Sequence, residues 1–119
     1  MKSYKELIVW QKSVTLVLSV YKLTEEFPDA EKFGLISQMR RCAVSIPSNI
    51  AEGWGRASDK EKKQFVRIAY GSASELETQL LISYKLGFVE KKKCDEADTE
   101  LTEVLKMLNG LINKLTTSC

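Results

Sequence analysis

The sequence predicts an all-α protein, a single-domain four-helix bundle with up-down-up-down topology. Four segments, at about 5–26, 30–52, 59–86 and 95–115, repeat apolar residues at the three- and four-residue spacing of one helix face. The 119 residues include only two prolines and six glycines, too few breakers for many short strands. Long helices joined by short loops pack antiparallel, and this length suits one domain, 1–119.

The first helical segment is apolar over an unusually wide arc. One stripe consists of Leu7, Trp10, Val14, Val17 and Tyr21. A second stripe, about 100° away, consists of Val9, Leu16, Val20 and Leu23. A four-helix core of this size covers only about one such stripe, so we expect the chain to form a homo-oligomer.

Proline and glycine separate the second segment from its neighbours. Pro28 disfavours helical geometry at Phe27, and Asp29 is a suitable residue to begin the next helix. The residues expected to face inward are Phe33, Ile36, Met39, Ala43, Ile46 and Ile50. Gly53 and Gly55 are expected to close this helix in the left-handed conformation.

The third and fourth segments carry clear boundary signals. Ser58 and Glu61 have the spacing of a capping box, which opens the third helix, and Gly87 is expected to end it. The fourth segment begins at Cys94 or Asp95. Its heptad seam consists of Ala97, Leu101, Val104, Leu108, Leu111 and Leu115.

The stretch SIPSNIAEGWGR, residues 45–56, interrupts the apolar pattern of the second segment. Pro47 removes one helical hydrogen bond and is expected to bend the helix. A polar stripe runs along one face there, formed by Arg41, Ser45, Ser48 or Asn49, and Glu52. Its expected charge pairs combine Arg40 or Arg41 with Glu75 or Glu77 of the third segment. We expect the stripe to hold helices, or subunits, in register.

Several enzyme classes are disfavoured. The chain has no histidine, the commonest general base and metal ligand, and its three cysteines lack C-x-x-C spacing. Glu75 and Glu77 are two residues apart and so point to nearly opposite sides of a helix. The Gly53-Trp54-Gly55 turn follows a helix, unlike a nucleotide-binding loop. We therefore predict no catalytic residues, metal or cofactor. No apolar run is long enough for a membrane span, and we expect a cytoplasmic protein.

At these residues the chain resembles a known bacterial family. The segments RRCAVSIPSNIAEGWGR and FVRIAYGSASELETQL, with the Leu-Gly-Phe turn that follows, resemble the four-helix-bundle proteins encoded in intervening sequences of 23S ribosomal RNA genes. The matching positions are Arg40, Arg41, Ser45, Pro47, Asn49, Glu52, Gly53, Gly55, Gly71, Ser72, Glu75 and Glu77. The resemblance implies a ring-like homopentamer. The chain is also similar to accessory proteins of diversity-generating retroelements, which are basic pentamers that bind nucleic acid and a reverse transcriptase.

Up-down topology sorts the charges between the two ends of the bundle. One end collects eight basic side chains against three acidic ones, a net charge of +5: Lys2, Lys5, Arg56, Lys60, Lys62, Lys63, Arg67 and Lys114 against Glu6, Asp59 and Glu61. The other end has six basic and nine acidic side chains, a net charge of −3. In a ring of parallel subunits, the basic ends would form a rim that attracts phosphates without reading bases.

Two functions fit this charge pattern. The chain binds RNA or DNA through the basic rim, or it is a ring that docks another protein and has no nucleic-acid role. Trp54 lies in the basic turn, where it would either stack on an unpaired base or pack against another helix or subunit. Salt-sensitive nucleic-acid binding would separate the two functions.

Overall fold

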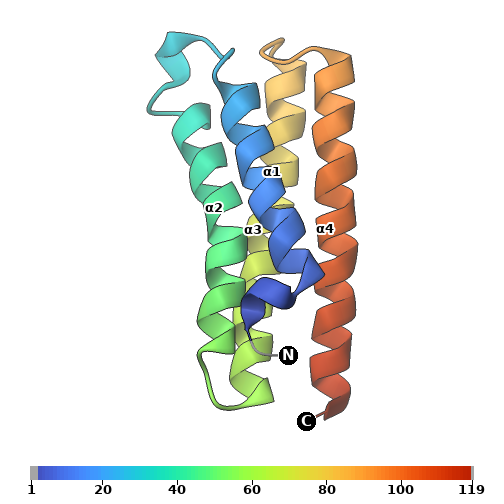
Figure 1. Cartoon of the computed structure of the whole chain (residues 1–119). Helices are drawn as coiled ribbons and strands as arrows, with labels where there is room; N and C mark the ends of the chain where they lie inside the picture. The colour runs from blue at the N-terminus through green and yellow to red at the C-terminus, as the bar shows by residue number, and fades with distance from the viewer. Residues whose placement is uncertain (1–2, 119) are drawn as a thin grey trace.

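The computed structural model describes residues 3–118 and has four long helices that run alternately up and down (Figure 1). They are α1 (Ile8–Thr24), α2 (Leu35–Trp54), α3 (Asp59–Lys85) and α4 (Lys91–Ser118). Two short 3₁₀ turns, η1 (Tyr4–Glu6) and η2 (Asp29–Glu31), precede α1 and α2. No strand occurs within the described residues. The prediction of an all-α four-helix bundle is confirmed.

The bundle is elongated, measuring 45 × 23 × 20 Å, and its two ends differ in what they contain. The turn from α2 to α3 and the end of α4 lie at the lower end in Figure 1, and the shorter α1 begins above them, in the lower half of the bundle. We call the lower end the basic end, after the eight basic residues assigned to it above. The other two turns lie at the upper end, which we call the acidic end.

The core runs along the axis and draws on all four helices. Its fully buried side chains include Leu16, Met39, Ile46, Leu76 and Leu108. In α1 it is the second predicted stripe that enters the core, formed by Val9, Leu16, Val20 and Leu23. The first stripe is half-buried from Leu7 to Val17, and Tyr21 is exposed. The other helices therefore bury only the second apolar stripe of α1 completely.

The start of α2 differs from its predicted position near residue 30. Asp29 begins only the 3₁₀ turn, and α2 starts at Leu35, whose backbone N–H donates to Glu31 Oε1 at 3.2 Å. Gly34, in an irregular conformation, separates the two elements. As a result the prediction that Phe33 faces inward is wrong, because Phe33 lies before the helix and is 89% exposed.

The start of α4 also differs from prediction, since it begins at Lys91 and not at Cys94 or Asp95. Lysines in a first turn oppose the helix dipole, which carries an energetic cost. Carboxylates offset this cost: Lys91 Nζ lies 2.8 Å from Asp95 Oδ2, and Lys93 Nζ lies 2.7 Å from Glu26 Oε2.

The glycines at the two helix ends act differently. Gly87 has a positive φ of 82°, and the backbone N–H of Phe88 donates to the Ser83 carbonyl at 2.9 Å, which completes a Schellman cap as expected for Gly87. The expected left-handed conformation of Gly53 and Gly55 is wrong. Gly53 lies within α2, and Gly55 has a φ of −80°.

Candidate nucleic-acid interface

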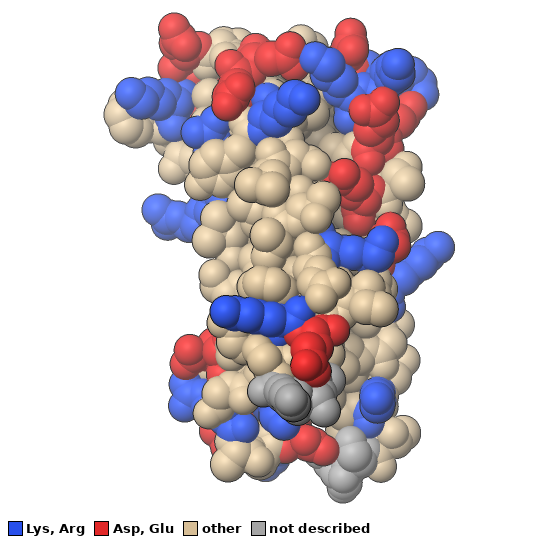
Figure 2. Space-filling model, viewed as in Figure 1, with Lys and Arg blue, Asp and Glu red and all other residues tan. Residues whose placement is uncertain are grey.

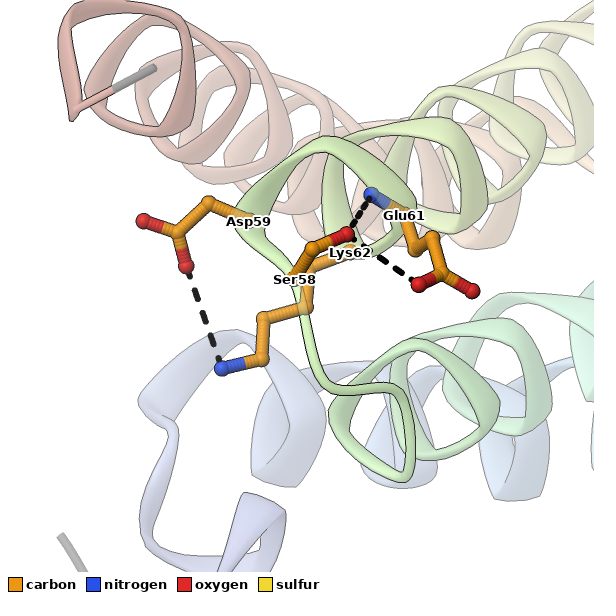
Figure 3. A network of polar contacts seen from close by, with 4 residues as sticks. All are labelled: Ser58, Asp59, Glu61 and Lys62. Atoms are coloured by element: carbon orange, nitrogen blue, oxygen red, sulfur yellow. Dashed lines mark hydrogen bonds and ion pairs between the residues drawn. The ribbon is translucent and has the colours of Figure 1, made fainter.

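The basic end is built around the first turn of α3 (Figure 3). The Ser58 hydroxyl accepts a hydrogen bond from the Glu61 backbone N–H at 3.2 Å and donates to Glu61 Oε1 at 3.1 Å. The Ser58 half of the predicted capping box is thus formed and satisfies one of the unpaired N–H groups of the helix start, while the Glu61 carboxylate accepts from the Ser58 hydroxyl and not from its backbone N–H. This cap fixes the position from which the basic side chains of α3 project.

A close approach between α2 and α3 holds the turn in place. A Cβ built on Gly53 would lie 3.0 Å from Phe65 Cβ and 3.4 Å from the Lys62 carbonyl oxygen. Only a residue without a side chain lets the two helices come this close. Glycine is therefore required at position 53 because there is no room for a side chain, and not because of its backbone conformation.

Two of the predicted basic residues lie over aromatic rings. The Arg56 guanidinium is 5.0 Å from the centroid of Phe65, and its Nη2 is 2.7 Å from Glu52 Oε1. Lys62 Nζ is 5.4 Å from the centroid of Trp54 and 3.9 Å from Asp59 Oδ1. Cations within about 6 Å of a ring centroid are attracted to its face. Both side chains are therefore held against the bundle, and Trp54 is half-buried beneath Lys62.

The remaining basic residues of α3 form a row. Lys60, Lys63 and Arg67 are spaced by three and four residues, which places them on one helix face over about 10 Å. Lys60 and Arg67 are exposed and Lys63 is half-buried. Lys5, in η1, is also exposed at this end. Lys2 lies outside the described residues.

Charge is distributed unevenly over the surface. In Figure 2 the charged side chains gather toward the two ends, and a broad uncharged area lies between them over α1 and α2. The exposed apolar side chains of α1 include Ile8 and Leu18, of which Leu18 is 66% exposed. The surface thus offers a charged end and an uncharged side, two regions of different chemistry.

The residues of the polar stripe are bound mainly within the chain. Ser45 Oγ lies 2.9 Å from Ser72 Oγ of α3, and Asn49 Nδ2 donates to the Ser45 carbonyl oxygen and hydroxyl, both at 2.8 Å. Pro47 is buried within α2, which continues on both sides of it. These contacts link α2 to α3 beside the core.

The arginines of the stripe do not make the expected charge pairs. Arg40 Nε donates to Thr24 Oγ1 at 2.9 Å, and its guanidinium lies 4.5 Å from the centroid of Tyr21. Arg40 therefore joins α2 to α1. Arg41, Glu75 and Glu77 are exposed. Across residues 3–118, no ion pair connects Arg40 or Arg41 with Glu75 or Glu77, so these pairs are not formed within one chain.

The cysteines described by the structure are poor nucleophiles. Burial, together with a hydrogen bond to Glu75, raises the pKa of the Cys42 thiol to about 11. Burial, with the nearby Asp95 carboxylate, also raises the pKa of Cys94. Both thiols are therefore protonated at neutral pH, whereas catalysis and metal binding need the thiolate. In the part of the chain that is described, no three His, Cys, Asp or Glu residues cluster as a metal would require.

Together these features define a class: an all-α four-helix bundle with a rigid, capped basic turn at one end. No helix within residues 3–118 combines the length and hydropathy needed to cross a membrane. The family model of the 23S rRNA-intervening sequence protein matches residues 5–110, so the chain belongs to that family.

A solved structure supports the same fold. The chain is similar to a protein of unknown function from the S23 ribosomal protein family of Bacteroides thetaiotaomicron, with a TM-score of 0.82. The two are 23% identical, and the alignment covers 89% of this chain and 96% of the other. At this identity the likeness establishes the fold alone. No match was found among curated proteins.

Proposed function

We propose that this protein is a non-enzymatic, oligomeric nucleic-acid-binding protein of the cytoplasm. It contacts phosphates through the basic end, without base-specific readout, and RNA is its preferred ligand. The observation that carries this proposal is the row of Lys60, Lys63 and Arg67 on the capped, rigid start of α3. Lysine and arginine that neutralise phosphates release counterions, which drives sequence-independent binding. The preference for RNA over DNA rests on the family name alone, 23S rRNA-intervening sequence protein.

The uncharged side of the bundle supports the oligomer. Ile8 and Leu18 of α1 are exposed, and Ile68 and Leu81 are exposed on α3, which lies diagonally across the bundle from α1. Exposed apolar surface on a globular protein is typical of an interaction site, and a ring needs such surface on two sides of each subunit. Parallel subunits packed through these sides bring their basic ends to one rim, where several copies act on one RNA. The count of five subunits rests on the family resemblance alone.

The nucleic-acid proposal is tested by fluorescence anisotropy with a labelled, structured RNA and nuclease-treated protein, titrated from low to physiological salt. The logarithm of the affinity should fall linearly with the logarithm of salt concentration. Reversal of the row, as Lys60→Glu with Lys63→Glu and Arg67→Glu, should lower the affinity by about a hundredfold and reduce the slope by about three.

The matched control reverses lysines at the acidic end. Lys85→Glu with Lys91→Glu and Lys92→Glu changes the net charge by the same −6 as reversal of the row, and it should change the affinity less than twofold if the basic end is the site. Equal losses in the two variants would mean that net charge, and not the basic end, controls binding. No binding of the native protein at low salt would remove the proposal.

The oligomer is tested by light scattering coupled to size-exclusion chromatography. Leu18→Glu places a charge on the uncharged side and should shift the protein toward the monomer, while Lys106→Glu on α4 should not. A native protein that remains a folded monomer at micromolar concentration would contradict the proposal of a ring.

A second candidate function is a protein-docking ring without a nucleic-acid role. Phe33 favours it, because an 89% exposed aromatic side chain at the acidic end is a suitable anchor for another protein. This candidate predicts that the native oligomer binds no RNA even at low salt, which is the outcome that separates the two functions.

A further inference from the structure

We infer that the basic end binds base-paired stretches of nucleic acid in preference to unpaired ones. The inference rests on the proposed function, and it specifies which form of nucleic acid the basic end binds. Proteins that hold single strands combine positive charge with exposed aromatic faces on which bases stack. Proteins that hold duplex RNA read its shape and its regularly spaced phosphates. The distinction therefore depends on whether the basic end offers free rings.

The two rings in the α2–α3 turn region already carry cations. Lys62 Nζ lies 5.4 Å from the centroid of Trp54, and the Arg56 guanidinium lies 5.0 Å from that of Phe65. Both rings are half-buried, and Trp54 packs against the core. Arg56 and Lys62 each occupy one face of a ring. A base could stack on that face only by displacing the cation, and the same cation is needed to attract the phosphate.

The two rings at the start of the chain are occupied by one another. Tyr4 and Trp10 pack edge to face, with centroids 5.4 Å apart and an interplanar angle of 66°. Both are half-buried. The next ring along α3 is Tyr70, which is exposed and lies three residues, about 4.5 Å along the helix axis, beyond Arg67 on the same face. The rings at the basic end are thus covered by cations or by one another, and the exposed ring nearest to the row is Tyr70, at its far edge.

The geometry of the cations favours the same ligand. Lys60, Lys63 and Arg67 project from one face of a capped helix, so their spacing is fixed before binding. A duplex has a stiff backbone with regularly spaced phosphates, and a fixed row can meet it without ordering the ligand. A flexible single strand would lose conformational freedom on the same row, with no stacking to compensate.

The inference is tested by anisotropy with three labelled probes of equal phosphate count: an RNA duplex, a DNA duplex and oligouridine. We expect the native oligomer to bind the RNA duplex at least about tenfold more tightly than oligouridine at the same salt concentration. The salt slope should also be steeper for duplexes, because each contacted phosphate releases more counterion there.

A second readout reports stacking directly. The chain has two tryptophans, so Trp10→Phe leaves Trp54 as the single tryptophan, which is excited selectively over the tyrosines. Saturation with oligouridine or duplex should leave the Trp54 emission nearly unchanged, whereas a stacked base would quench it. Tyr70→Ala serves as the control for the remaining ring and should not weaken binding of either RNA.

The outcomes separate the two proposals. Tighter binding of the duplex with unquenched Trp54 supports the inference. Equal or tighter binding of oligouridine, or quenching of Trp54, overturns it and leaves the proposed function standing. No binding of any probe at low salt removes the proposed function and the inference together.

Discussion

At the basic end Lys60, Lys63 and Arg67 make no ion pair within residues 3–118, whereas at the acidic end Lys91 and Lys93 lie against carboxylates. The hydrogen bonds to Asp95 and Glu26 raise the pKa of these two lysines, which keeps them charged but paired. Lysines are therefore paired with carboxylates at the acidic end, whereas the lysines of the α3 row at the basic end remain available to a ligand. The lesson is that a lysine run such as residues 91–93 does not by itself mark a site.

The two ends also differ in why they need glycine: Gly53 at the basic end and Gly87 at the acidic end. Substitution of Gly53 should have the largest effect on stability. Gly53→Val inserts a branched side chain where even a Cβ would lie 3.0 Å from Phe65 Cβ. We expect the free energy of unfolding to fall by about 3 kcal/mol, measured by urea unfolding at a fixed protein concentration. RNA affinity should fall as well, because the displaced turn carries Arg56 and Lys62. An unchanged stability would show that the α2–α3 contact is not tight.

Gly87 at the acidic end should matter less, and for a different reason. Gly87→Ala forces a Cβ onto a backbone with φ of 82°, which should cost about 1 to 2 kcal/mol in urea unfolding while RNA affinity stays the same. The control is Gly71→Ala, since a Cβ there meets nothing within 4 Å and should stabilise the helix by about 1 kcal/mol. A loss of stability for Gly71→Ala would point to close subunit contact at α3.

The cap of α3 should have a moderate effect confined to the basic end. Ser58→Ala removes the acceptor for the Glu61 N–H and should cost about 1 kcal/mol of stability, read from thermal unfolding. Ser74→Ala is the control, because that hydroxyl only bonds the Tyr70 carbonyl within the helix. If both variants lose equally, the capping contact contributes nothing specific.

The ion pair between Lys93 and Glu26 should have the smallest effect. Both side chains are largely exposed, and exposed pairs contribute little to stability. Lys93→Gln and Glu26→Gln should each leave the melting temperature and the RNA affinity within experimental error. A clear drop in either variant would show that this contact anchors α4 to the end of α1.

Most of the fold follows from the sequence, because the helices depend on local signals. The apolar spacing identified four helices, and the Ser58 cap and the Gly87 cap lie where their motifs indicated. The start of α2 was missed because Pro28 and Asp29 resemble a helix start, while the Glu31 carboxylate caps a helix only after Gly34 has turned the chain. That contact depends on a conformation that the pattern alone does not specify.

The candidate site was predicted less completely. The grouping of basic residues at one end follows from topology, and topology follows from the helix count. The contacts that those residues make do not follow from topology. That Arg40 reaches Thr24 on α1, and that Lys62 lies over Trp54, depend on how the helices are rotated about their axes. Periodicity places a residue on a face but does not reveal which neighbour lies opposite.

The order of the helices bears on how the chain reaches this structure. Each helix packs on the next one in sequence, with the most extensive contact between α2 and α3, and α1 meets α4 to close the bundle. Such local connectivity is associated with fast folding. We expect the α2–α3 hairpin, joined by the tight Gly53 contact, to form early and the α1–α4 contact to form last. The proposed RNA-binding turn would then be assembled before the bundle has closed.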